Sequence, residues 1–290
     1  MRRALVAGCA LLAVFAAGCG APAGADGDLV DDWTAAAAPK PFTPDVGACL
    51  FGAAANNLLS GYNATDCATS HVREIVHVGQ IATEATTPPK VGSKTARGAF
   101  DECDAQARQY LGGDWRATRL DLEVLFPSPP AWSGGARWFR CDVLETPSLD
   151  SGEPVTRSGR LRDALKAASP LHLGCFQPTM SGDEIDEMKP VKCTQKHRSE
   201  FVGVWTAPDT PYSDFTRSEE RAHAACRGVV ATYAKVPNDS NLRFRTGTVY
   251  YPPTAVEWAL GDRGVRCLFW YDRDVSRSIK AAGPSALPIR

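Results

Sequence analysis

The chain has 290 residues, enough for one large domain or two ordinary ones, and 44% of them are hydrophobic, as in a globular protein. Its 32 basic and 33 acidic residues give a net charge of −1, so no overall field favours nucleic acid or an anionic surface. We therefore expect no nucleic-acid partner and look for function in local sites.

Residues 1–18 have the pattern of an export signal. Two arginines follow Met1, and residues 4–17 form an apolar stretch that is shorter than the roughly 20 residues of a membrane-spanning helix. Residues 16–19, Ala-Ala-Gly-Cys, resemble a bacterial lipobox. We predict that residues 1–18 are removed and that a lipid on Cys19 anchors the protein to the outer face of the cytoplasmic membrane. The alternative is cleavage at residues 23–25 and secretion.

A self-comparison shows that residues 46–145 reappear at 172–271 with an offset of 126. Only the middle cysteine departs from this register, Cys103 against Cys226, and two small compensating indels account for that. The residues that recur are Cys49, Cys67, His71, Glu74, Val76, Pro127, Trp132, Arg137, Arg140 and Cys141, matched by Cys175, Cys193, His197, Glu200, Val202, Pro253, Trp258, Arg263, Arg266 and Cys267. The coincidences at one offset predict a duplicated domain.

The repeat sets the boundaries of the two copies and of the segments around them. The two copies are expected over residues 45–145 and 171–272, each of a common domain size. Residues 19–44 are rich in Ala, Gly, Pro and Asp and predict a flexible tether. Residues 146–170 contain several Pro and Gly and predict a linker. Residues 273–290 lack periodicity, and we expect a loose tail.

Apolar residues at helical spacing predict one helix in each copy, over residues 94–111 and 217–234. Ser93 is the expected N-cap of the first helix, and Thr216 with Glu219 gives a capping-box pattern before the second. Short apolar or alternating runs predict strands at 72–79, 120–126, 137–144, 201–206 and 264–271. The predicted order in each copy is β-β-α-β-β. The fold class is therefore α+β, as two tandem repeats, each with one helix packed on a small antiparallel sheet and stapled by disulfides.

The chain contains ten cysteines. Cys9 lies inside the export signal and Cys19 is the predicted lipid site, which leaves four cysteines in each copy. Because an exported chain enters an oxidising compartment, we expect these to form disulfides. Four cysteines allow three pairings per domain, and we favour the one in which each bridge joins neighbouring elements. The favoured pairs are Cys49–Cys67, Cys103–Cys141, Cys175–Cys193 and Cys226–Cys267.

The Cys-x3-His-x2-Glu pattern, which occurs twice, is the candidate for chemistry. Its possible binding residues are His71, Glu74, His197 and Glu200. Thiolate, imidazole and carboxylate are all zinc ligands, but paired CxxC or HxxxH spacing is missing. Cys–His catalysis would need a free thiolate, and disulfides leave none over. A ligand-binding role and simple hydrogen bonding within the local turn both stay open.

No GxSxG, P-loop or GxGxxG motif occurs in a recognisable context. We expect no catalytic residues, no metal and no cofactor. The alternative is an extracytoplasmic enzyme or a metal-binding protein that uses the Cys-x3-His-x2-Glu sites. For Trp132, Trp258, Arg140 and Arg266 we expect structural roles, as aromatic cover over a helix edge and as locally paired charges.

Taken together, these motifs resemble the septum-formation domain of actinobacterial envelope proteins. The resemblance rests on Val46-Gly47-x-Cys49-Leu50, the Cys-x3-His-x2-Glu-x-Val pattern, the helix cysteine and the closing Trp…Arg-Cys, and it covers nearly all of the chain after the tether. It implies a non-catalytic module outside the cytoplasm that works in septum formation or cell-wall processes. The implied partners are the membrane, through the N-terminal lipid, and an envelope protein or cell-wall component.

Overall fold

The structure is a computed structural model that describes residues 40–52 and 57–290. The predicted signal peptide, the lipid site Cys19 and most of the tether lie outside the described residues. Residues 41–290 form one compact unit. In this described part of the chain, no helix is both long enough and apolar enough to cross a membrane.

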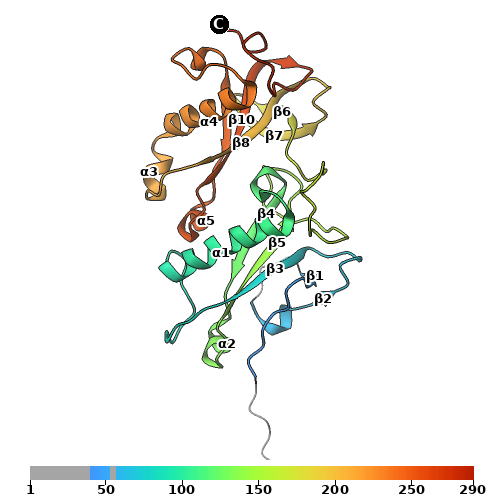
Figure 1. The fold of residues 1–290 in the computed structure, drawn as a ribbon, viewed down its shortest axis with the longest axis vertical. Coiled ribbons are helices and arrows are strands. Elements are labelled where there is room, and N and C mark those ends of the chain that lie inside the picture. Colours follow the sequence, from blue (N-terminus) through green and yellow to red (C-terminus); the bar gives the residue numbers. More distant parts are fainter. Residues whose placement is uncertain (1–39, 53–56) are drawn as a thin grey trace, which may run out of the picture. The chain divides into compact units, whose positions relative to one another are not determined.

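The first half, residues 40–170, contains a five-stranded antiparallel sheet with the strand order β2-β1-β3-β5-β4. One long helix, α1, packs against this sheet (Figure 1). The elements are β1 Cys49–Leu50, β2 Ala64–Thr65, β3 Arg73–Gln80, α1 Lys94–Leu111, β4 Leu120–Leu125, α2 Pro129–Ser133 and β5 Trp138–Glu145, with short 3-10 turns at Leu59–Gly61 and Trp115–Ala117.

The second half, residues 171–290, has a sheet of the order β7-β6-β8-β10-β9, so each strand takes the same place as its counterpart in the first half. The helix α4 packs against β8, β9 and β10. The elements are β6 Cys175–Ser181, β7 Glu184–Val191, β8 His197–Thr206, α3 Tyr212–Thr216, α4 Glu219–Ala234, β9 Gly247–Tyr251, α5 Ala255–Leu260 and β10 Gly264–Val275, with a 3-10 turn at Leu242–Phe244.

Both predicted long helices are present, and their ends test the capping predictions. The Ser93 side chain accepts a hydrogen bond from Ala96 N at 3.2 Å, as an N-cap does, and α1 ends at Gly112 with a φ of 77° that favours glycine. The capping box predicted at Thr216 and Glu219 is wrong. Thr216 is instead the last residue of α3, and Ser218 precedes α4 without a side-chain cap.

The predicted order β-β-α-β-β omits one strand in each half, because three strands precede each long helix. The predicted ranges include none for β1, β2, β6, β7 or β9; β2 has only two residues, and β2 and β7 are the edge strands beside β1 and β6. The sequence of β7, Glu-Ile-Asp-Glu-Met-Lys-Pro-Val, contains charged residues and a proline, which are poor strand formers. It pairs with β6 at the edge of the sheet, where one side needs no partner, so the composition is tolerated.

Four disulfides join the elements with the favoured pairing. Cys103–Cys141 and Cys226–Cys267 tie each long helix to the strand β5 or β10 that it covers, and these cysteines belong to the two main apolar cores. In a chain-entropy model each bridge contributes about 3–4 kcal/mol to stability. Helix and sheet are therefore held together both by apolar burial and by a covalent bond.

The expectation of a loose tail is wrong. Ile279 and Leu287 are buried in the second core, and Ala281 N donates to Tyr233 O at the end of α4. In the first half, Leu161 is buried likewise and Asp163 N donates to Tyr110 O near the end of α1. Such isolated apolar residues have no periodicity, yet each belongs to a buried core.

The residues of the two halves also contact each other within this compact unit. The buried Arg116 guanidinium pairs with Asp262 at 2.7 Å and with Asp104 at 2.5 Å. Arg266 donates to the carbonyl oxygens of Arg116 and Leu120, each at 3.0 Å. A charge buried at such a junction needs both of its carboxylate partners.

Candidate functional site

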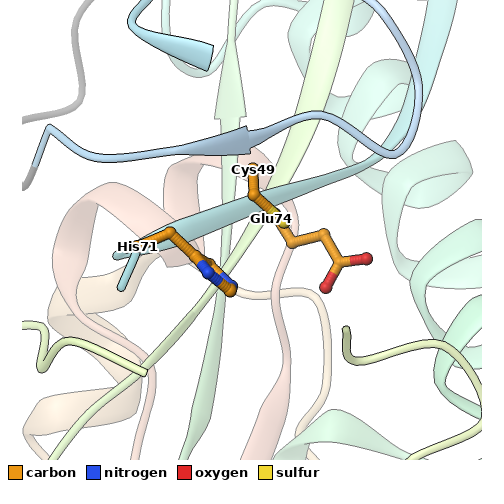
Figure 2. A group of neighbouring side chains, drawn as sticks. All are labelled: Cys49, His71 and Glu74. Atoms are coloured by element: carbon orange, nitrogen blue, oxygen red, sulfur yellow. The ribbon is translucent and has the colours of Figure 1, made fainter. Parts of the chain in front are cut away.

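The residues of the Cys-x3-His-x2-Glu pattern come together around β1 and β3 in the first half. Cys49 on β1 is paired with Glu74 on β3, and His71 lies two residues before β3 (Figure 2). One potential ligand atom from each of these three residues lies within 4.8 Å of the others. In the second half, Cys175 is paired with Glu200 in the same way. In the second half the corresponding group is Cys175, Cys193 and Glu200, and His197 is not part of it.

The cysteines of both sites are bound in disulfides. Cys49 is joined to Cys67 and Cys175 to Cys193. A disulfide sulfur offers neither the thiolate that zinc prefers nor the nucleophile that covalent catalysis needs. With the disulfides formed, each site retains only an imidazole and a carboxylate for other interactions.

Each histidine is fully buried and is fixed by its own turn. The Nδ1 atom of His71 lies 2.9 Å from Thr69 O, and that of His197 lies 2.8 Å from Gln195 O. Because a carbonyl oxygen only accepts, Nδ1 carries the proton in both rings. Nε2 of each ring is buried and has no hydrogen-bond partner among the described residues.

The buried carboxylate of Glu74 holds three parts of the first half together. Glu74 lies on β3, accepts from the Tyr110 hydroxyl on α1, and accepts from Leu161 N at 2.6 Å. Leu161 belongs to the segment that was predicted as a linker. Arg160 adds a weaker ion pair at 3.8 Å. The carboxylate thus joins strand, helix and the following segment.

Glu200 makes the same connections in the second half. Its carboxylate accepts from the Tyr233 hydroxyl on α4 at 2.6 Å, from Ile279 N at 2.8 Å, and from the Ser278 hydroxyl. Ile279 lies in the segment predicted as a loose tail. We call each of these arrangements a glutamate clamp: Glu74 with Tyr110 and Leu161, and Glu200 with Tyr233 and Ile279.

The tyrosines of the clamps are site residues that sequence reasoning missed. Burial raises the pKa of both Tyr110 and Tyr233, and the hydrogen bond to the glutamate raises it further, so both phenols stay protonated and donate. A signal for them was present in the sequence. Each tyrosine follows the helix cysteine, Cys103 or Cys226, by seven residues.

The tryptophans and arginines that recur near the ends of the two sheets also have structural roles. The indole Nε1 of Trp132 donates to Ala85 O at 2.8 Å, and the guanidinium of Arg137 lies over the ring, 4.3 Å from its centroid. Trp258 and Arg263 repeat the stacking at 4.2 Å. The stacked arginine donates in each case to the carbonyl oxygen of its own tryptophan.

A comparison with protein families matches residues 46–267 to the family described as septum formation. The matched segment is well over half of the chain. The chain belongs to the septum-formation family. The match begins just before β1 and ends inside β10, so it includes the first sheet, most of the second sheet and the cysteines of all four disulfides. A search of curated proteins and a search of solved structures each found no match.

The first half of the chain has a buried charged cluster with no equivalent in the second half. Asp142 on β5 is fully buried, 3.1 Å from Arg140 Nη2 and 4.0 Å from Arg73 Nη1, and Arg73 also pairs with Glu123. Burial raises the pKa of Asp142 to about 6, although the two arginines lower it. Sequence reasoning expected a local partner for Arg140 but did not identify Asp142.

Proposed function

We propose that this chain is a non-catalytic lipoprotein of the cell envelope, built from a tandem-duplicated domain, that binds or scaffolds partners in septum formation or cell-wall processes. Membership of the septum-formation family supports a role in septum formation. The observation that carries the non-catalytic part is the use of the Cys-x3-His-x2-Glu residues: the cysteines are disulfides, and the glutamates clamp the fold.

The tandem duplication is supported by structure and sequence together. The two sheets have the same strand order, and the disulfides and glutamate clamps occupy corresponding places. The matching residues follow a single offset along the chain. Two related domains on one tether would present two similar surfaces, so that binding to a repetitive partner gains from effective concentration.

The lipid anchor is part of the proposal and rests on the sequence of residues 1–19. The test is the intact mass of the native protein from membranes, before and after reduction. We expect a chain that begins at Cys19 with a diacylglyceryl group, and eight cysteines that are alkylated only after reduction. A chain that begins elsewhere would overturn the anchor. Cysteines that react without reduction would return thiol chemistry to consideration.

A scaffold and an enzyme differ in the amount of protein that the cell needs. In cells that lack the chain, expression would be titrated from a few per cent of the native amount upward, and misplaced or missing septa would be counted. A scaffold acts stoichiometrically, so we expect rescue to rise in proportion to the amount. Full rescue at about a tenth of the native amount would instead indicate turnover. A Cys19→Ala chain, matched in amount, tests whether rescue requires the anchor.

A further inference from the structure

Arg245, just before β9 in the second half, is a buried cation without an acidic partner. The residue is only 9% exposed. Its Nη1 atom donates to Leu287 O at 2.7 Å, whereas Nε is buried and has no hydrogen-bond partner among the described residues. Within the described part of the chain, no carboxylate forms an ion pair with this guanidinium. Because burying a cation without a counter-charge is strongly unfavourable, Arg245 points to an anion that comes from outside the chain.

The matching arginine of the first half, Arg119, has the counter-charge that Arg245 lacks. The register of β9 on β10 equals that of β4 on β5 at the offset of 126, so Arg119 corresponds to Arg245, and Glu145 corresponds to Tyr271. Arg119 Nη2 lies 2.9 Å from Glu145 Oε1. The second half therefore keeps the arginine and has a phenol in place of the carboxylate. The first half shows which group this arginine binds when the chain supplies it.

Arg245 lines a small cavity in the second half. The cavity has a volume of about 220 Å³. Gly247 also lines it, and a Cβ atom at this position would lie 3.0 Å from Cδ1 of Trp270, so a side chain there would press on another lining residue. Ligand sites for whole drug-sized molecules are larger, at roughly 300–1,000 Å³. The cavity is therefore suited to the end group of a ligand.

The charges around the cavity favour an anionic group. Three arginines line it, Arg243, Arg245 and Arg290, against one acidic residue, Asp272. Arg290 pairs with Asp272, whose side chain is 72% exposed, so this carboxylate is screened by water. Phe244 is 45% exposed at the same cavity and adds apolar surface. Cationic and aromatic side chains together suit an anion that is attached to a small apolar body.

We propose that this cavity binds a carboxylate end group, of the size of the last residue of a peptide, through the guanidinium of Arg245. The carboxylate would act as Glu145 does beside Arg119. A planar carboxylate matches the fork of donors on a guanidinium, which favours it over a spherical anion. The inference is drawn from the second half and goes beyond the proposed function, since it depends neither on the lipid anchor nor on septum formation. A phosphate ester is the competing ligand.

Isothermal titration calorimetry of the full chain tests the proposal. The probe is N-acetyl-alanyl-alanine with a free carboxylate, and the control probe is the same dipeptide as its amide, at matched ionic strength. We expect heat of binding from the acid and none from the amide. Arg245→Met should weaken binding of the acid by about tenfold or more, because it removes a charge-assisted hydrogen bond. The matched control is Arg119→Met, which removes the corresponding internal ion pair and should leave binding unchanged.

The outcomes separate a carboxylate site from the alternatives. Inorganic phosphate is titrated in parallel, and binding of phosphate without binding of the acid would overturn the carboxylate assignment. No heat from the acid at about 10 mM would overturn the site itself. Equal losses in Arg119→Met and Arg245→Met would do the same. If Arg245→Met alters the circular dichroism spectrum, Arg290→Gln on the exposed side of the cavity is the second variant, with an expected loss of about threefold. None of these results bears on the anchor or on the rescue of septa.

Discussion

The two sheets share a strand order but differ in the side chains that lie on one face. In the first sheet Asp142, Arg140 and Arg73 lie on this face as a buried charged cluster. In the second, Leu268 takes the place of Asp142 at the offset of 126, and it packs in a small apolar cluster with Phe176 and Met188. The same strand order therefore accommodates either charged or apolar side chains on this face. Only the first half carries the desolvation cost of burying these charges.

Removing one arginine of the charged cluster tests how much the free energy of unfolding depends on pairing with Asp142. Arg140→Met leaves Asp142 buried beside a single cation, so we expect a loss of about 3–5 kcal/mol in the free energy of unfolding. The control is Arg266→Met in the second half, where Asp121 and two carbonyl oxygens are the partners and water has access. There we expect about 1 kcal/mol. Urea unfolding followed by circular dichroism measures both, and equal losses would contradict the comparison.

The charged cluster also predicts a pH dependence that the second sheet lacks. Burial raises the pKa of Asp142 to about 6, above its usual value of 3.8. A raised folded-state pKa contributes stability that is complete below about pH 4 and is lost as the pH rises through 6. The shift corresponds to about 3 kcal/mol.

An Asp142→Asn chain isolates this contribution, because the other carboxylates titrate equally in both proteins. Between pH 4 and pH 7, we expect the wild type to lose about 2.4 kcal/mol of unfolding free energy relative to Asp142→Asn. Urea denaturation at four pH values gives the two curves. Parallel curves would mean that Asp142 is ionised in the folded protein throughout this range.

The contrast between the sheets also shows what a sequence can predict. The offset of 126, the disulfide pairing and the long helices follow from spacing and periodicity, which are local and repeated signals. Leu161 and Ile279 are single apolar residues whose backbone N–H groups pair with the clamp glutamates, so no periodic pattern in the sequence predicts their positions. Asp142 is buried because the face of β5 on which it lies is covered, and the residues next to it in the sequence do not predict that.

The glutamate clamps, which both halves share, should respond alike. Tyr110→Phe and Tyr233→Phe each remove one donor from a buried carboxylate and leave the ring in place. A hydrogen bond to a charged group is worth about 1.5–3 kcal/mol, so we expect a loss of about 2 kcal/mol in each case. Urea unfolding measures the two losses. A large loss in one half only would indicate that the halves do not share this construction.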